Sequence, residues 1–402
     1  MKDGWEAKRL GDLCDIELGK TPARANKTFW DERRETGNVW LSIADLLSAE
    51  DNVVLDSREY LSNTGAAMSK TVKKGTLLAS FKLTLGRLAF AGRDLFTNEA
   101  IAALTIRDER ELAGEFLFYF LHFFDWDKAT EGDIKLKGKT LNKAKLKEIA
   151  VLFPALPEQQ RVVGILDEAF EDIATAKASA EKNLENARAV FESHLESLFT
   201  RQGDGWKEKG FSEVCEISSR LVDPRLPEYR DLLHVGGANI ESKTGNLTGL
   251  RTAREEGLKS GKFLFDETMV LYSKIRPYLM KVARPGCKGL CSADIYPLSV
   301  KPGLLDRDFL FHLLLAPEFT DYAIGGSARA GMPKVNRDHL FAFRVHLPSV
   351  NEQRTCADEL DGLHADSQRL ESVYQRKLAA LDELKKSLLH EAFNGRLTKS
   401  AA

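Results

Sequence analysis

The sequence predicts an α+β protein built as an internal repeat: two tandem α/β modules, each followed by a long helix. Two observations lead to this prediction. Short motifs of the first half return in the same order in the second half. In addition, residues 158–200 and 352–394 contain no proline and one glycine each, which is typical of long helices. A duplicated sequence predicts a duplicated fold.

The repeat extends along the whole chain. Gly4-Trp5 returns as Gly205-Trp206, and from Trp40 onward equivalent residues are displaced by about 194 positions. Matches at one displacement through the modules and both helices exclude a chance similarity. The matched residues include Ala44-Asp45-Leu46 with Ala238-Asn239-Ile240, Arg87 with Lys281, Asn142 with Asn336, Val151 with Val345, Glu158-Gln159 with Glu352-Gln353, Leu166-Asp167 with Leu360-Asp361, and Phe199 with Phe393.

The two modules have the same predicted internal order. Apolar runs bounded by Gly, Lys and Pro predict strands of a twisted sheet. A short amphipathic helix is predicted after them, and a proline-containing segment then leads into the long helix. The elements are Gly75–Phe81 and Glu115–Phe124 in the first module, residues 1–157, and Met269–Tyr272 and Asp308–Leu315 in the second, residues 201–351.

The two long helices carry apolar stripes. Each helix of about 43 residues would be roughly 65 Å long, more than one module can cover. The spacing predicts that the two helices pair as an antiparallel coiled coil, with the modules related by an approximate twofold axis. Two separate surface helices, each packed on its own module, remain the alternative. The second stripe is Leu360, Leu363, Leu370, Tyr374, Leu381, Leu384 and Leu388, broken by Ser367 and Lys377, and the first is Leu166, Ala169, Ile173, Ala176, Ala180, Leu184, Ala187, Phe191 and Leu198.

The composition limits the class of protein. The chain has 402 residues, 43% hydrophobic and 29% charged residues, and a formal net charge of −2, which does not by itself indicate a nucleic-acid binder. No apolar segment is long enough to cross a membrane, and the first residues do not resemble a secretion signal. Five cysteines without metal-ligand spacing indicate reduced thiols. We therefore expect a cytoplasmic protein. The tail 395–402 follows an Asn-Gly helix stop.

Local charge is more informative than total charge. Residues 65–93 and the matching residues 269–293 contain lysines and arginines but no acid, and residues 135–147 contain six lysines and no acid. Basic segments at equivalent places in both copies favour DNA-phosphate binding, and arginines there could also contact guanine edges. The alternative for any one lysine is a solvated surface. The predicted DNA-binding residues are Lys70, Lys73, Lys74, Lys82, Arg87, Lys135, Lys137, Lys139, Lys274, Arg276, Lys281, Arg329, Lys334 and Arg337.

The catalytic motifs that we tested do not fit. Gly132 to Thr140 resembles a phosphate-binding loop but has five residues between its glycines where the motif needs four. Glu6-Ala-Lys8 and Glu383-Leu-Lys385 have the Glu-x-Lys form of nucleases without the upstream acid of a metal site. The eight histidines are scattered and form no catalytic pair. We expect no catalytic residues, no metal site and no cofactor in this chain.

The ordered set of motifs resembles the specificity (S) subunit of type I restriction-modification enzymes along essentially the whole length. The resemblance is carried by a duplicated set of weak motifs. The second copy departs from the pattern, because Asp223-Pro224 stands for the expected Thr-Pro and Val350-Asn351 for Leu-Pro. The motifs are Gly19-Lys-Thr-Pro22, Trp40 to Leu46, Lys74 to Leu78, Leu85 to Ala89 and Pro154 to Gln160.

This resemblance implies a function. Each module would be a target recognition domain that recognises one half of an asymmetric, bipartite DNA site. The paired helices would set the spacing and dock methyltransferase (M) subunits and restriction (R) subunits. S-adenosylmethionine, ATP and Mg²⁺ are then expected on those partners, and this chain would be a non-catalytic part of an endonuclease and adenine methyltransferase complex.

Three alternatives are distinguishable. The chain could be a coiled-coil adaptor without sequence-selective DNA binding, the specificity subunit of another methyltransferase-nuclease system, or a nuclease that cuts DNA with Mg²⁺ alone. The two copies differ most in residues 20–38 and 218–233, where the first is longer by seven residues. Two similar scaffolds with different loops predict two different half-sites.

Overall fold

A computed structural model describes residues 4–49, 51–130, 134–135, 138–139, 141–201, 203, 205–217, 220–327 and 333–397. The chain divides into two compact units, one formed by 1–179 and 377–402 and the other by 180–376. Two long helices, α5 (Leu156–Arg201) and α10 (Val350–Phe393), each contribute to both units. Helices were predicted at 158–200 and 352–394, so the sequence located both within two residues.

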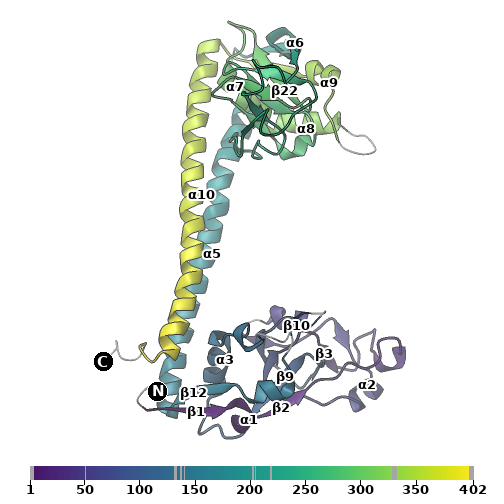
Figure 1. Ribbon diagram of the computed structural model, residues 1–402, viewed down its shortest axis with the longest axis vertical. Coiled ribbons are helices and arrows are strands. Elements are labelled where there is room, and N and C mark those ends of the chain that lie inside the picture. Colours follow the sequence, from purple (N-terminus) through teal and green to yellow (C-terminus); the bar gives the residue numbers. More distant parts are fainter. Residues whose placement is uncertain are drawn as a thin grey trace. The chain divides into compact units, whose positions relative to one another are not determined.

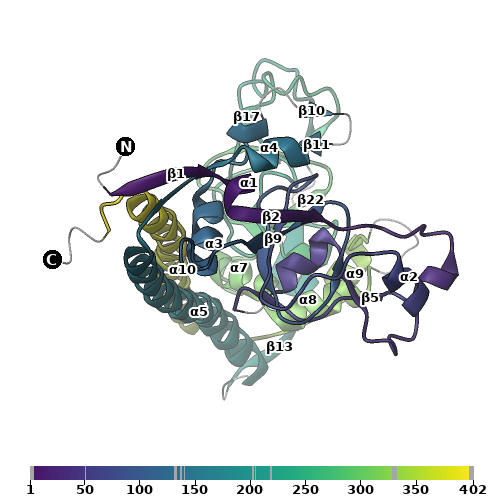
Figure 2. The same cartoon turned by 90° about the horizontal axis from the view of Figure 1, so that it is seen from below.

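The first unit contains a five-stranded sheet in the order β2-β9-β6-β7-β4 and a three-stranded sheet β5-β3-β8, and β1 pairs with β12 and β10 with β11. The helix α3 lies between the larger sheet and the paired helices (Figures 1 and 2). The strands are β1 Trp5–Arg9, β2 Cys14–Leu18, β3 Val39–Leu41, β4 Val53–Val54, β5 Glu59–Tyr60, β6 Leu77–Ser80, β7 Leu88–Ala91, β8 Phe96–Thr97, β9 Ile101–Ile106, β10 Ile134–Lys135, β11 Gly138–Lys139 and β12 Ala150–Pro154; the short helices are α1 Leu10–Leu13, η1 Lys27–Phe29, η2 Ile43–Ser48, α2 Asn63–Ala67, α3 Gly114–Phe123, η3 Lys128–Thr130 and α4 Lys143–Lys147.

The second unit repeats this plan with a four-stranded sheet β14-β22-β19-β20, a five-stranded sheet β15-β18-β21-β16-β17 and the pair β13-β23. The helix α7 occupies the place of α3 (Figure 1). The strands are β13 Lys207–Gly210, β14 Cys215–Ile217, β15 Leu221–Val222, β16 Leu233–Val235, β17 Arg251–Thr252, β18 Lys262–Phe265, β19 Val270–Ser273, β20 Val282–Ala283, β21 Gly289–Cys291, β22 Ile295–Val300 and β23 Arg344–Leu347; the helices are α6 Phe211–Val214, η4 Pro277–Leu279, α7 Arg307–Leu315, α8 Pro317–Gly325 and α9 Arg337–Ala342.

Strand register confirms the repeat. In the first unit β2 pairs antiparallel with β9 and places Cys14 opposite Ile106, while in the second β14 pairs with β22 and places Cys215 opposite Val300. A polar turn is repeated as well: Asp45 Oδ2 accepts the Ser42 amide at 2.7 Å, and Asn239 Oδ1 accepts the Gly236 amide at 2.8 Å. The two modules therefore share one scaffold.

The predicted amphipathic helices were wrong in one respect. Side chains of α3 are buried from Phe116 to Leu121 and those of α7 from Phe309 to Leu315, so each helix is apolar nearly all round. The reason is that each helix packs against the sheet on one face and the long helices on the other, which leaves little surface for water. These two helices form the centres of the main cores.

The long helices pair antiparallel within each unit. Lys177 forms an ion pair with Asp382 in the first unit, and Arg188 Nε contacts a carboxylate oxygen of Glu371 at 2.9 Å in the second. On α5 the predicted stripe is confirmed, because its most buried members recur every seven residues from Leu166. These residues are Leu166, Ile173, Ala180 and Ala187.

The stripe on α10 was partly wrong. Ser367, predicted to break the seam, is buried within it and donates a hydrogen bond to the Ala187 carbonyl oxygen. Leu370 and Leu384, predicted to be seam residues, are 43% and 46% exposed. The small Ala187 opposite Ser367 leaves room for the hydroxyl to reach a backbone acceptor, which satisfies the buried polar group.

Candidate nucleic-acid interface

A basic cluster forms in the second unit from two segments far apart in sequence. Residues 274–276, after β19, pair with residues 333–335, before α9: the Lys274 carbonyl accepts from Val335 N at 2.8 Å and Arg276 N donates to the Pro333 carbonyl at 2.9 Å. This pairing brings predicted residues of separate sequence runs to one place. They are Lys274, Arg276, Lys334 and Arg337.

Burial and like charge act on Lys274. Its side chain is only 12% exposed, donates to the Ala293 carbonyl and lies over the Tyr296 ring at 5.0 Å. Burial lowers the pKa of Lys274, and the positive charges of Lys334 and Arg337 lower it further, against the opposing effect of Asp294. Concentrated positive charge of this kind favours an anionic ligand such as a phosphate.

Arg276 lies at the exposed tip of this cluster. It has a left-handed backbone, with φ 51°, and Met280 at the other end of η4 has φ 47°. A left-handed conformation is unfavourable for residues other than glycine and is often found at functional sites. Arg276 and its exposed neighbour Tyr278 therefore project from a rigid turn.

In the first unit the segment after β6 pairs with the segment before α4, as the equivalent segments do in the second unit. Two lysines of the first unit, however, form ion pairs with acids. Leu141 N donates to the Phe81 carbonyl at 3.0 Å, which brings the segment before α4 beside Lys82. Lys70 Nζ forms an ion pair with Glu17 at 2.6 Å, and Lys73 Nζ with Asp94 at 2.8 Å. These pairs are exposed and weak, so both lysines remain available to a stronger anion.

Three further predicted residues have described side chains. Lys74 is exposed. Arg87 donates to the Ile43 carbonyl at 3.3 Å and Lys281 donates to the Gly237 carbonyl at 2.5 Å, so Arg87 and Lys281 hold neighbouring loops in place. Lys137 and Arg329 lie outside the described residues. For Lys135 and Lys139 the structure describes the backbone alone, in the β10-β11 hairpin. Their assignment to DNA binding stays a prediction.

Two glutamines that we did not single out as functional join each module to its helix. Gln159 Oε1 accepts the Ala113 amide at 2.9 Å, and its Nε2 donates to the carbonyls of Glu111 and Pro154 at 2.7 and 2.8 Å. Both glutamines are fully buried. Each glutamine lies five residues after a proline, in the repeated Glu-Gln motif, and this repetition was the feature of the sequence that could have indicated their role.

Gln353 repeats every one of these contacts. Its Oε1 accepts the Asp306 amide at 2.8 Å, and its Nε2 donates to the carbonyls of Leu304 and Pro348 at 3.1 and 3.0 Å. In both copies the amide therefore connects the start of the long helix with the loop before α3 or α7. Buried amides with all partners satisfied fix geometry more than they add stability.

A charged cluster adds to the second junction. Arg284 forms a bidentate pair with Asp361, with both N–O distances 2.7 Å, and reaches Asp308 at 3.1 Å. His312 Nε2 lies 2.8 Å from Asp361 Oδ1 and donates, because a carboxylate only accepts. Burial lowers the pKa of His312, while His312 and Arg284 hold the pKa of Asp361 well below its usual range despite burial.

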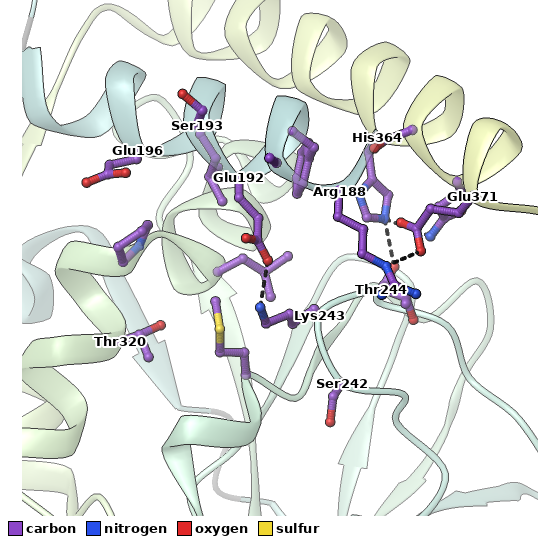
Figure 3. A pocket seen from close by; sticks show the side chains of 18 of the residues that line it. Arg188, Glu192, Ser193, Glu196, Ser242, Lys243, Thr244, Thr320, His364 and Glu371 are labelled. Carbon is purple, nitrogen blue, oxygen red and sulfur yellow. Dashed lines mark hydrogen bonds and ion pairs between the residues drawn. The ribbon is translucent and has the colours of Figure 1, made fainter. Parts of the chain in front are cut away.

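A cavity of about 830 Å³ lies beside this junction, between α5, α8, α10 and the loop 242–244 (Figure 3). Two ion pairs line it: Lys243 contacts Glu192 at 2.6 Å, and Arg188 contacts Glu371. His364 Nε2 lies 3.2 Å from the Thr244 carbonyl. These contacts attach the loop 242–244 to both helices.

Within the described part of the chain, no group of three or more His, Cys, Asp or Glu side chains could hold a metal ion. Burial raises the pKa of Cys14, Cys215 and Cys291 to about 12, so these thiols are not nucleophilic at neutral pH. Among the described helices, none has the length and apolar character needed to cross a membrane.

The geometry defines a class: internally duplicated α+β proteins in which each module carries basic residues and is attached to one of two antiparallel helices. The model of the type I restriction modification DNA specificity domain matches residues 2–185 and again 203–377. This chain belongs to that family of specificity subunits, which are themselves non-catalytic.

Relatives and solved structures agree with this assignment. The chain is 30% identical over 320 residues to the type I restriction enzyme EcoDI specificity subunit of Escherichia coli, covering 71% of this chain and 70% of the relative. It is 23% identical over 309 residues to the MjaIX specificity subunit of Methanocaldococcus jannaschii, covering 67% and 66%.

Two solved structures have the same fold. A chain from a structure of complex assembly and conformational transition in the type I R-M system matches with a TM-score of 0.76 at 17% identity, covering 99% of both chains. The HsdS subunit from Thermoanaerobacter tengcongensis matches with a TM-score of 0.60 at 17% identity, covering 99% of this chain and 98% of that one.

Proposed function

We propose that this specificity subunit recognises a bipartite, asymmetric DNA site, one half through each module, and docks methyltransferase and restriction subunits. The observation that supports this most directly is the duplicated scaffold with unlike basic residues in its two copies. Lys274, Arg276, Lys334 and Arg337 gather in the second unit, whereas Lys70 and Lys73 have acidic neighbours in the first. Two equivalent scaffolds that carry different side chains favour different base sequences in the two half-sites.

The division of labour follows from the chemistry. This chain would supply DNA sequence selectivity in the cytoplasm, and the partner subunits would hold S-adenosylmethionine, ATP and Mg²⁺. The long helices support the docking of partner subunits because α10 exposes large apolar side chains. These are Leu370, Val373 and Leu384. Leu370 and Val373 are three residues apart and so lie on one face of the helix, and contiguous exposed apolar surface is typical of protein interfaces.

Methylome sequencing tests the proposal. A host that expresses this chain with its methyltransferase subunit should acquire methylated adenine in one interrupted motif. Replacing residues 201–350 by the equivalent module of a relative should change one half of that motif and leave the other half intact. A motif that stays unchanged after the replacement would contradict the proposal.

A further inference from the structure

A groove of about 780 Å³ in the first unit lies over the start of α3, the start of α5 and the β6-β7 hairpin; we call it the α3–α5 groove. Phe90 and Phe118 line it with their rings 5.4 Å apart. Two exposed carboxylates, Glu115 of α3 and Asp167 of α5, also line it. The groove thus combines flat aromatic surface with negative charge.

The equivalent place in the second unit contains three arginines. Arg284 packs over the Phe311 ring at 4.2 Å while it pairs with Asp361 and Asp308. Arg307 contacts Asp308 at 2.7 Å and donates to the Glu267 carbonyl. Arg354 contacts Asp306 at 3.3 Å. All three guanidinium groups are therefore bound by the acids of α7 and α10 and by the backbone around them.

The first copy has none of these arginines. Phe90 stands for Arg284, Gly114 for Arg307 and Gln160 for Arg354. The equivalence is structural as well. Leu78 pairs with Ala89 just before Phe90, and Leu271 pairs with Ala283 just before Arg284.

The first copy keeps acidic residues at the positions of Asp361 and Asp308, although it lacks the arginines that pair with them in the second copy. Asp167 is equivalent to Asp361, and Glu115 to Asp308. Asp167 accepts a hydrogen bond from the Tyr119 hydroxyl, and across the described residues no cation pairs with Asp167 or Glu115. The opposite wall carries two cations, Lys73, which forms an exposed pair with Asp94, and the exposed Lys74.

We propose that the α3–α5 groove binds an arginine side chain of a protein partner. Asp167 would accept the guanidinium as Asp361 accepts that of Arg284, and the Phe90 and Phe118 rings would cover its flat face. The second copy shows that this arrangement of acids and an aromatic ring binds a guanidinium group within the same protein. The identity of the partner as the methyltransferase subunit rests on the proposed function; the guanidinium site does not.

The first experiment tests the site without a partner. The full chain is labelled with 3-fluorotyrosine, and the Tyr119 resonance, assigned from Tyr119→Phe, is followed by ¹⁹F NMR during titration with Nα-acetyl-arginine amide. Nα-acetyl-citrulline amide is the neutral control. We expect a saturable shift with the arginine derivative alone, in the millimolar range. No saturable shift in the wild-type chain would overturn the proposal.

Variants locate the binding. The double variant D167N/E115Q should lose the shift, and so should F90R, because its own guanidinium would occupy the groove as Arg284 does in the second copy. E168Q, an exposed carboxylate of the same helix, is the matched control and should behave as wild type. Thermal unfolding checks that each variant is folded. If F90R does not fold, the test rests on D167N/E115Q. A Tyr119 resonance shift of wild-type size in D167N/E115Q would contradict the proposal.

The second experiment uses the complex. Affinity for the methyltransferase subunit encoded with this chain should fall about tenfold to a hundredfold in D167N/E115Q and in F90R, as expected for a lost charged hydrogen bond, and stay within twofold in E168Q. Unchanged affinity in both variants overturns the assignment to this partner. If the wild-type chain does not bind the methyltransferase at all, the proposed function fails, while the NMR titration still decides the groove.

Discussion

The two module–helix junctions make the same hydrogen bonds to the backbone, but the side chains around them are aromatic in the first copy and basic in the second. Gln159 and Gln353 make the same three backbone hydrogen bonds. Around them, Tyr119, Phe90 and Phe170 of the first copy are replaced by His312, Arg284 and His364 in the second. The comparison shows that the backbone hydrogen bonds define the junction and that the surrounding contacts are free to change.

The largest effect is expected where the two junctions are identical. Gln159→Leu and Gln353→Leu each leave one partly buried amide, one partly buried carbonyl and one buried carbonyl without partners, so each should lower the free energy of unfolding by about 3 kcal/mol. Urea unfolding followed by circular dichroism measures this loss. Gln160→Leu, at an exposed neighbouring position, is the control and should cost less than about 0.5 kcal/mol. Losses that differ widely between the two copies would contradict the equivalence.

The second effect separates the copies. Asp361→Asn removes the negative charge and one of the two oxygens that accept from Arg284 and His312, and we expect a loss of about 2 kcal/mol after allowing for the 38% exposure of Asp361. Asp167→Asn replaces the charged acceptor of the Tyr119 hydroxyl by a neutral one and should cost about 0.5–1 kcal/mol. Equal losses in urea unfolding would show that the charged cluster adds nothing to the second junction.

The third effect is the pH dependence that His312 contributes in the second copy. Burial lowers the folded-state pKa of His312, so its contribution is present above the ordinary histidine value, about 6.5, and is lost as the pH falls below it. His312→Tyr, which copies Tyr119, should remove this dependence. Between pH 7 and pH 5.5 we expect the wild type to lose roughly 1 kcal/mol more than the variant. Parallel pH profiles of the two proteins would refute this.

The smallest effect tests the helix seam. Ala176 of α5 is equivalent to Leu370 of α10, and Leu370 is largely exposed, so Leu370→Ala should cost less than about 0.5 kcal/mol. Ser367→Ala, which removes a buried hydrogen bond to Ala187, should cost about 1 kcal/mol. If thermal unfolding shows that Leu370→Ala lowers stability more than Ser367→Ala does, then Leu370 contributes to the helix pairing as the sequence spacing predicted.

The sequence predicted the fold well because repeat and periodicity are properties of position along the chain. The displacement of 194 residues located equivalent turns, as the Asp45 and Asn239 caps confirm. Apolar spacing located both long helices but not the burial of Ser367, which depends on the small residue opposite on the other helix.

The candidate site was less accessible to sequence reasoning. Runs without acids do not show that acids approach from elsewhere, as Glu17 does to Lys70 and Asp94 to Lys73. The joining of residues 274–276 to 333–335 depends on the sheet and could not be read from either segment. The same holds for Arg24, whose guanidinium lies 4.4 Å from the Trp30 ring and 4.7 Å from the Trp40 ring in the longer first loop.

The buried glutamines have a consequence for the evolution of this chain. Every partner of Gln159 and Gln353 is a backbone amide or carbonyl, and a backbone group is the same whatever side chain its residue carries. A recombination event that exchanges a whole module at this point therefore keeps the attachment to the helix intact. New binding preferences can be acquired in one genetic step, without a compensating mutation at the joint.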